Sequence, residues 1–274
     1  MTDSLHIYLT SSTIFVRKKT RIFLKSKLEN VGEWSWKGHI PEALPWEMIL
    51  PTAQSKKTPF VHIYLGGGMC KLMVFDLPEN LNDFAETIAE AKTQMIQKLG
   101  INQTEWQFTI DTNHANQKVI ICAAPTQLME AIQKLAAIYP KKVISVSPYI
   151  NGIWNLLTTR VPMNDKTALF ICEEDAITVL VADKGAIQLI TSILHKKDAL
   201  MIEPEVERLY IALKSEAPID LRFAFNDAMA SALANDYSTM LLPSRHLPAS
   251  ATAPDFCDLA FVVAAQSESQ SMLN

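Results

Sequence analysis

The chain contains two runs of short β-type segments in the same order, and this repetition restricts its fold more than any other feature. In each run, β-branched and aromatic residues alternate with polar ones, and short polar joins separate the segments. This pattern predicts a three-stranded meander in each run. When the runs are superposed, Leu9 matches Cys172 and Ile14 matches Ile177, which we interpret as an internal repeat of topology. The predicted strands are residues 5–9, 13–18 and 21–26 in the first meander and 168–172, 176–183 and 186–193 in the second.

Strands and helices alternate after each meander. Residues 83–99 carry apolar side chains at spacings of three and four, which is typical of an amphipathic helix. Asp83 and Glu86 can form a capping box at its start, and Gly100 follows its last turn as a stop signal. The other predicted elements are helices at 126–139, 227–235 and 255–265, a helical turn near 198–206, and strands at 60–65, 71–77, 105–111, 118–124, 142–147, 208–213 and 219–223.

Composition and charge argue against several classes of function. The chain has 274 residues and a net charge of −4, with both signs spread along it, so nucleic acid is not an expected partner. The 4 cysteines have no C-x-x-C spacing and lie in apolar segments, which is typical of reduced, buried thiols, and the 6 histidines show no metal-ligand spacing. The longest apolar runs are far shorter than the roughly 20 residues of a membrane span, so direct membrane insertion is not expected.

Gly66, Gly67 and Gly68 separate two of the predicted strands. Glycines can cradle a phosphate, but a P-loop requires a following Gly-Lys-Ser/Thr that opens a helix, and here residues 69–71 lead into a strand. We therefore expect a flexible hairpin tip that uses glycine's tolerance of positive φ.

Residues 30–59 form an irregular stretch that we interpret as an inserted loop rich in tryptophan and proline. Trp34, Trp36 and Trp46 are candidate partner-binding residues, because tryptophan is enriched at binding hot spots and loops often present it. The alternative, equally weighted, is that these side chains close over the core beneath the loop.

A basic run in the first meander is a second candidate partner site. Arg17, Lys18 and Lys19 lead this run, which could meet an acidic partner or the anionic inner leaflet of a membrane. More often such a run is the solvated face and turn of an edge hairpin.

The order of the elements resembles the actin-like fold shared by actin and hexokinase. Within that superfamily, residues 61–111 and 165–194 look most like the PilM family and the cytoplasmic domain of GspL, which belong to the platforms of type IV pili and type II secretion. The resemblance implies an α/β, ribonuclease H-like duplicated fold of two lobes, with mixed sheets flanked by helices. It implies a first half at 1–150, a second half at 165–265, and a disordered tail at 266–274.

In nucleotide-binding members of this superfamily, each meander begins with an Asp-x-Gly turn that holds a metal and the phosphates. Here Tyr8 and Ile171 fall where the metal-holding carboxylates belong, and Phe261 in the last predicted helix falls where a base needs space. The resemblance therefore implies a pseudo-ATPase without cofactor or catalytic residues. The degenerate phosphate-loop positions are Thr10, Ser11 and Ser12 in the first half and Glu173, Glu174 and Asp175 in the second.

The three adjacent carboxylates from Glu173 to Asp175 also permit other interpretations. They would repel a triphosphate of like charge by about 1 to 4 kcal/mol for each close pair. A bound Mg²⁺ or Ca²⁺ could instead recruit them as oxygen ligands. The favoured alternative is a solvated hairpin tip that is kept polar to prevent aggregation.

By resemblance, the chain is expected to be a non-catalytic cytoplasmic scaffold, peripheral to the inner membrane through its partner. That partner would be the cytoplasmic tail of a membrane protein, as for PilM, or the assembly ATPase, as for GspL. Because the chain ends without a membrane helix, the PilM-like arrangement is favoured. A homodimer is left open. The alternatives are an ATP-dependent, sugar-kinase-like phosphotransferase of the same fold and an inactive subunit that regulates a catalytic relative.

Overall fold

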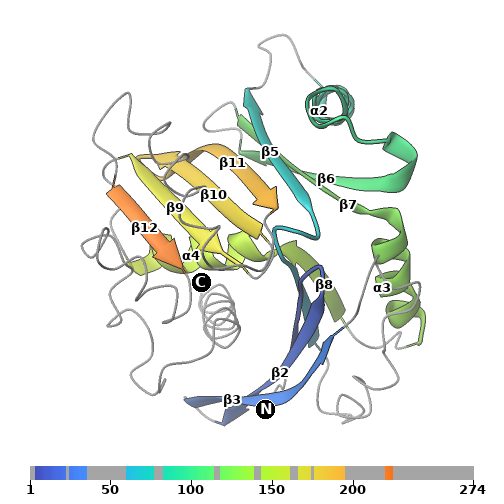
Figure 1. The fold of residues 1–274 in the computed structure, drawn as a ribbon, viewed down its shortest axis with the longest axis vertical. Helices are drawn as coiled ribbons and strands as arrows, with labels where there is room; N and C mark the ends of the chain where they lie inside the picture. Colours follow the sequence, from blue (N-terminus) through green and yellow to red (C-terminus); the bar gives the residue numbers. More distant parts are fainter. Residues whose placement is uncertain are drawn as a thin grey trace.

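The computed structural model describes residues 4–22, 25–35, 60–76, 83–113, 118–138, 143–160, 166–173, 176–194 and 220–224. These residues form three β-sheets with helices packed against them (Figure 1).

The first sheet has five strands in the order β3-β2-β1-β4-β8. Strand β1 pairs antiparallel with β2 and parallel with β4, which in turn pairs parallel with β8. Strands β1 and β4 are almost entirely buried, as expected for central strands covered on both faces. The bounds are β1 (Ser4–Leu9), β2 (Thr13–Ile22), β3 (Lys25–Ser35), β4 (Phe60–Leu65) and β8 (Val143–Pro148).

The second sheet repeats four of these positions, in the order β11-β10-β9-β12. Strand β9 pairs antiparallel with β10 and parallel with β12, as β1 does with β2 and β4. The β1–β2 pair ends at Leu9 opposite Ile14, and the β9–β10 pair ends at Cys172 opposite Ile177, so the predicted internal repeat is confirmed. The bounds are β9 (Thr167–Cys172), β10 (Ala176–Asp183), β11 (Ala186–Leu194) and β12 (Asp220–Ala224).

A third sheet, in the order β5-β7-β6, lies beside β11 of the second sheet (Figure 1). Helix α2 (Phe84–Leu99) packs on it through Ala91 and Met95, which join a separate apolar cluster with Met73, Phe75 and Val119. The bounds are β5 (Lys71–Asp76), β6 (Trp106–Asn113), β7 (Lys118–Pro125), the short 3₁₀ helix η1 (Gln103–Glu105) and helix α3 (Thr126–Ile138).

Helix α2 begins and ends where its sequence signals predict. The Asp83 carboxylate accepts a hydrogen bond from the Ala85 backbone N–H at 3.0 Å. Gly100 adopts a left-handed conformation with φ of 62° and donates its backbone N–H to the Ile96 carbonyl at 2.9 Å. Both helix ends are therefore satisfied by the residues expected to cap them.

Helix α4 (Tyr149–Arg160) is absent from the sequence-based prediction. It begins directly after Pro148 and buries Tyr149, Ile150, Ile153 and Trp154 against the main core. These positions form one helical face, but Asn151, Gly152 and the threonines near its end have low helix propensity, which hid the pattern.

Several predicted boundaries in the first half are wrong. Strand β2 continues through Ile22, so the third predicted strand at 21–26 starts too early, and β3 extends to Ser35, into the predicted loop 30–59. Strands β4 and β5 do not form a hairpin, because they belong to different sheets. The remaining predicted strands are confirmed within a few residues; the elements expected at 198–206, 208–213, 227–235 and 255–265 and the tail lie outside the described residues. The division into halves at 1–150 and 165–265 stays a prediction.

Candidate functional site

Three turns meet where the first and second sheets approach each other. They are the β1–β2 turn, the β4–β5 turn and the β9–β10 turn, the tip that carries the acidic residues. The Gly66 backbone N–H donates to the Leu9 carbonyl at 2.8 Å, which holds the first two turns together. The Glu173 backbone N–H donates to the Ala176 carbonyl at 2.8 Å, which closes the third.

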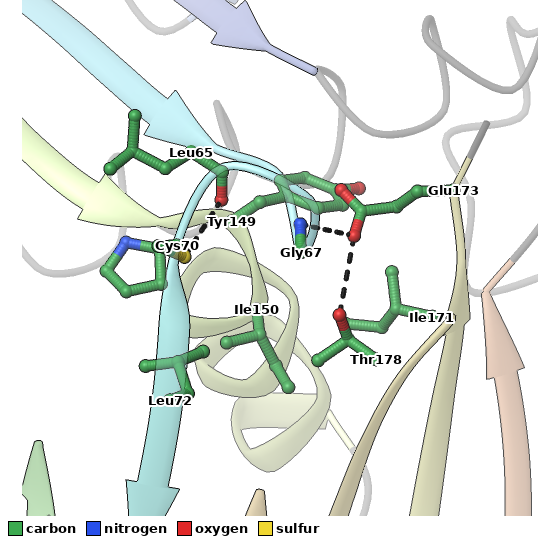
Figure 2. A pocket seen from close by; sticks show the side chains of 10 residues that line it. Leu65, Gly67, Cys70, Leu72, Tyr149, Ile150, Ile171, Glu173 and Thr178 are labelled. Atoms are coloured by element: carbon green, nitrogen blue, oxygen red, sulfur yellow. Dashed lines mark hydrogen bonds between the residues drawn. The ribbon is translucent and has the colours of Figure 1, made fainter. Parts of the chain in front are cut away.

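The carboxylate of Glu173 links the three turns. The Tyr8 hydroxyl donates a hydrogen bond to Oε1. The Gly67 backbone N–H donates to Oε2 at 2.7 Å (Figure 2). The Thr178 hydroxyl approaches Oε2 at 3.4 Å from β10 and also contacts the Ser192 hydroxyl at 2.9 Å. The Glu173 side chain is only 2% exposed, so the prediction of a solvated hairpin tip is wrong for this residue. The hydrogen-bond donors around the carboxylate offset the cost of burying its charge.

The glycines are required here by close approach, and not by positive φ as predicted. A Cβ atom on Gly66 would lie 2.7 Å from Oε1 of Glu173, and one on Gly67 would lie 2.8 Å from Oε2. The positive-φ glycines among the described residues are Gly100 and Gly185, so the 66–67 backbone is not left-handed. The missing side chains let the chain pass directly beneath the two carboxylate oxygens.

Little space remains around the carboxylate. A cavity of about 10 Å³ lies between Glu173, Gly67, Tyr149 and Cys70, which is at the lower limit for one water molecule (Figure 2). A hydrogen bond with Cys122, burial and the negative charge of Glu173 together raise the pKa of the Cys70 thiol well above its ordinary value. Cys70 is thus a neutral, buried thiol, as predicted for a structural cysteine.

The degenerate phosphate-loop positions have different surroundings. Thr10 is buried, and its hydroxyl accepts from the Thr13 backbone N–H at 2.9 Å, so it closes the β1–β2 turn. Ser11 is exposed and Ser12 is partly buried. Glu174, Asp175 and Phe261 lie outside the described residues, so the proposed acidic metal site is described only through Glu173. Within the described residues, no group of three potential metal ligands is present.

The candidate partner residues are separated in the structure. Trp34 lies in β3, partly buried, and packs against the main core, while Trp36 and Trp46 lie outside the described residues. Arg17, Lys18 and Lys19 lie within β2 and not at its turn. Arg17 is only 6% exposed, so the interpretation of this run as solvated is wrong at its first residue.

A histidine pair, which sequence reasoning missed, lies on the first sheet; His6 is buried and His62 is partly buried. The rings of His6 and His62 stack at 5.0 Å between centroids, and the Tyr64 hydroxyl lies 3.2 Å from Nδ1 of His6. Burial, His62 and Lys19 lower the pKa of His6 well below its ordinary value; burial and Lys19 lower the pKa of His62 to about 4. The parallel register places His6 directly opposite His62, and a period-two alignment of the two strands could have found this pair.

The hydrogen-bond donors at the junction, where the three turns meet, are already bonded to Glu173. The Tyr8 hydroxyl donates to one oxygen of the Glu173 carboxylate, and the Gly67 backbone N–H donates to the other. A phosphate in that place would meet a buried like charge. The arrangement is instead suited to holding the two sheets together.

No protein-family model matches the sequence, and no curated protein matches it. Solved structures do match in fold. A structure of the PilM-PilN type IV pilus biogenesis complex matches with a TM-score of 0.68 at 11% identity, covering 96% of this chain and 98% of the other. A Bacteroides thetaiotaomicron protein of unknown function with an actin-like ATPase fold matches with a TM-score of 0.61 at 12% identity, covering 95% of each chain.

The cytoplasmic domain of EpsL, an inner membrane component of the type II secretion system of Vibrio cholerae, matches with a TM-score of 0.54. The identity is 11%, over 98% of this chain and 95% of the other. Among the described residues, no helix is both long and apolar enough to cross a membrane. At these identities the comparisons establish the fold alone: the chain has the actin-like α/β fold expected from the order of its strands.

Proposed function

We propose that the chain is a non-catalytic scaffold of a type IV pilus or type II secretion platform, working on the cytoplasmic side of the inner membrane. Its partner would be the cytoplasmic tail of a membrane protein or the assembly ATPase. The observation that supports this proposal most is the whole-length similarity in fold to the PilM-PilN complex structure, with the EpsL cytoplasmic domain as a second neighbour.

The geometry of the junction supports the non-catalytic part of the proposal. The Glu173 carboxylate already accepts the hydrogen bond of the Gly67 backbone N–H, and Tyr8 lies where a metal-holding carboxylate is expected. A kinase of this fold needs that space for phosphate and metal. We therefore expect millimolar Mg-ATP to leave the melting temperature of the wild-type protein unchanged. A binding nucleotide at a hundred times its Kd would stabilise the fold by about 2.7 kcal/mol and would overturn this part of the proposal.

The scaffold part is tested by direct binding. Synthetic peptides that correspond to cytoplasmic tails of pilus and secretion membrane proteins from the same genome are titrated into the protein in a calorimeter. One peptide is expected to bind, with a weaker affinity for the Lys18→Glu/Lys19→Glu variant, because a basic strand region is a candidate docking surface. Lys98→Glu, an exposed charge reversal on α2, is the matched control. The assembly ATPase is titrated in the same way. If none of the tail peptides binds and the ATPase does not bind either, the proposed scaffold role is wrong.

A further inference from the structure

The groups around the Glu173 carboxylate come from both parts of the fold. Tyr8 belongs to β1 and Gly67 to the β4–β5 turn, whereas Thr178 belongs to β10. Figure 2 shows Gly67 and Thr178 beside the Glu173 carboxylate. Each of these three groups donates a hydrogen bond to one of the two carboxylate oxygens of Glu173. Tyr8 and Gly67, which belong to the first sheet and its turn, thus donate hydrogen bonds to a carboxylate that the β9–β10 turn of the second sheet supplies.

The donors are buried and held in place. Tyr8 packs its ring against Tyr149 at 4.8 Å and Phe15 at 5.9 Å between centroids, and both Tyr8 and Thr178 are almost fully buried. The Gly67 N–H is part of the main chain and is fixed by the turn, in which the Met69 N–H donates to the Gly66 carbonyl at 2.9 Å. Donors that are prearranged in a buried place favour an anionic oxygen more strongly than donors in water do.

The backbone is also shaped for two oxygens side by side. A Cβ atom on Gly66 would come too close to Oε1 of Glu173. A Cβ atom on Gly67 would likewise come too close to Oε2. Two consecutive residues without side chains therefore fit one planar carboxylate.

From this geometry we propose that the Gly66–Gly67 turn, with the Tyr8 and Thr178 hydroxyls, is an oxyanion-binding site that Glu173 occupies as an intramolecular ligand. An external oxyanion, a small carboxylate or a phosphate, takes the site when the Glu173 carboxylate is removed. In the wild-type protein such a ligand must displace Glu173, which also releases the bond between the two sheets. This inference concerns the junction and does not depend on the proposed membrane partner.

The test is chemical rescue of Glu173→Ala in the full chain. Thermal melting is measured with sodium formate, sodium phosphate or sodium chloride at constant ionic strength. Formate is expected to raise the melting temperature of the variant relative to chloride; at ten times its Kd the rise would be about 3 to 6 °C. A response to phosphate as well would show that the site also accepts a tetrahedral oxyanion, whereas a response to formate alone would restrict it to carboxylates.

Three proteins control for general salt effects. The wild type and Asp183→Ala, which removes an exposed carboxylate at the end of β10, are expected to show no difference between formate and chloride. In Tyr8→Phe/Glu173→Ala, one donor is lost, so the apparent Kd for formate should weaken about tenfold or more. The same rise in all variants, or no rise in Glu173→Ala, would overturn the proposal.

If Glu173→Ala does not fold in chloride, the readout becomes refolding from denaturant as formate is titrated. Recovery of the native circular dichroism signal is then expected with formate or phosphate but not with chloride. Glu173→Gln, in which an amide of similar shape fills the site, should fold without added anion and show no response to formate. A failure of every anion to restore Glu173→Ala, while Glu173→Gln folds, would refute the oxyanion site.

Discussion

Replacing Gly67 by alanine tests whether the junction is built around the Glu173 carboxylate. The added methyl group would overlap Oγ1 of Thr178 and lie 2.8 Å from Oε2 of Glu173 and 3.3 Å from Cβ of Ala176. The threonine side chain is short and β-branched, so it cannot move away easily. The glutamate can withdraw only by giving up its bonds to Gly67 and Tyr8.

These contributions set the expected loss of stability. Overpacking of a buried site costs about 1 to 3 kcal/mol, and one lost hydrogen bond to a charged group costs about 1.5 to 3 kcal/mol. The alanine restricts the unfolded chain and regains about 0.4 to 1 kcal/mol. We therefore expect Gly67→Ala to lower the free energy of unfolding by about 1.5 to 5.5 kcal/mol.

Urea denaturation followed by circular dichroism measures this change, and the melting temperature should fall by about 3 to 22 °C. Gly68→Ala, in the same turn but partly exposed, is the matched comparison and should lose less. In the double variant Gly67→Ala/Thr178→Ala, the overlap with Oγ1 is relieved, so its loss should be smaller than the sum of the single losses. A loss below 1 kcal/mol for Gly67→Ala would refute the close packing of the glycine turn on Glu173.

Three further predictions concern other parts of the molecule. His6 and His62 have pKa values below that of a histidine in the unfolded chain, so the unfolded state binds more protons as the pH falls. The free energy of unfolding, measured by urea denaturation, should therefore decrease as the pH falls from about 6.5 to 4. The variant His62→Gln should show a smaller decrease over this range. Asp83→Ala removes the N-cap of α2 and should cost about 1 kcal/mol of unfolding free energy, whereas Glu90→Ala on the same helix should cost less. The buried Cys70, whose pKa is raised, should resist iodoacetamide at pH 8 in the native protein and react after unfolding, as followed by peptide mass spectrometry; rapid native labelling would contradict its burial.

Local patterns predicted most of the regular structure. The second meander was found almost to the residue, because its strands are rich in apolar and β-branched residues and the Lys184-Gly185 turn adopts positive φ at both positions. The β2–β3 hairpin was predicted too short, since its basic and glycine-containing strands lack that composition and are held by pairing with β1 and with each other.

The candidate site was predicted only in part. Glu173 was identified as out of place beside a phosphate loop, but its sequence neighbours suggested a solvated tip. Its partners Tyr8 and Gly67 lie more than a hundred positions away in the chain, and a hydrogen bond over that separation leaves no periodic signal. The same reason explains why the glycine turn was interpreted as a hairpin: strand pairing across sheets is decided by the whole fold.

The sequence by itself determined the repeated meanders, the amphipathic helix with its caps and the charge balance, because each of these depends on residues close together in the chain. Only the tertiary structure decided which turns meet and whether a charged side chain faces water or the interior. The physical reason lies in Glu173: its carboxylate can be buried only where main-chain and hydroxyl donors from a distant part of the chain surround it, and folding alone brings those donors together.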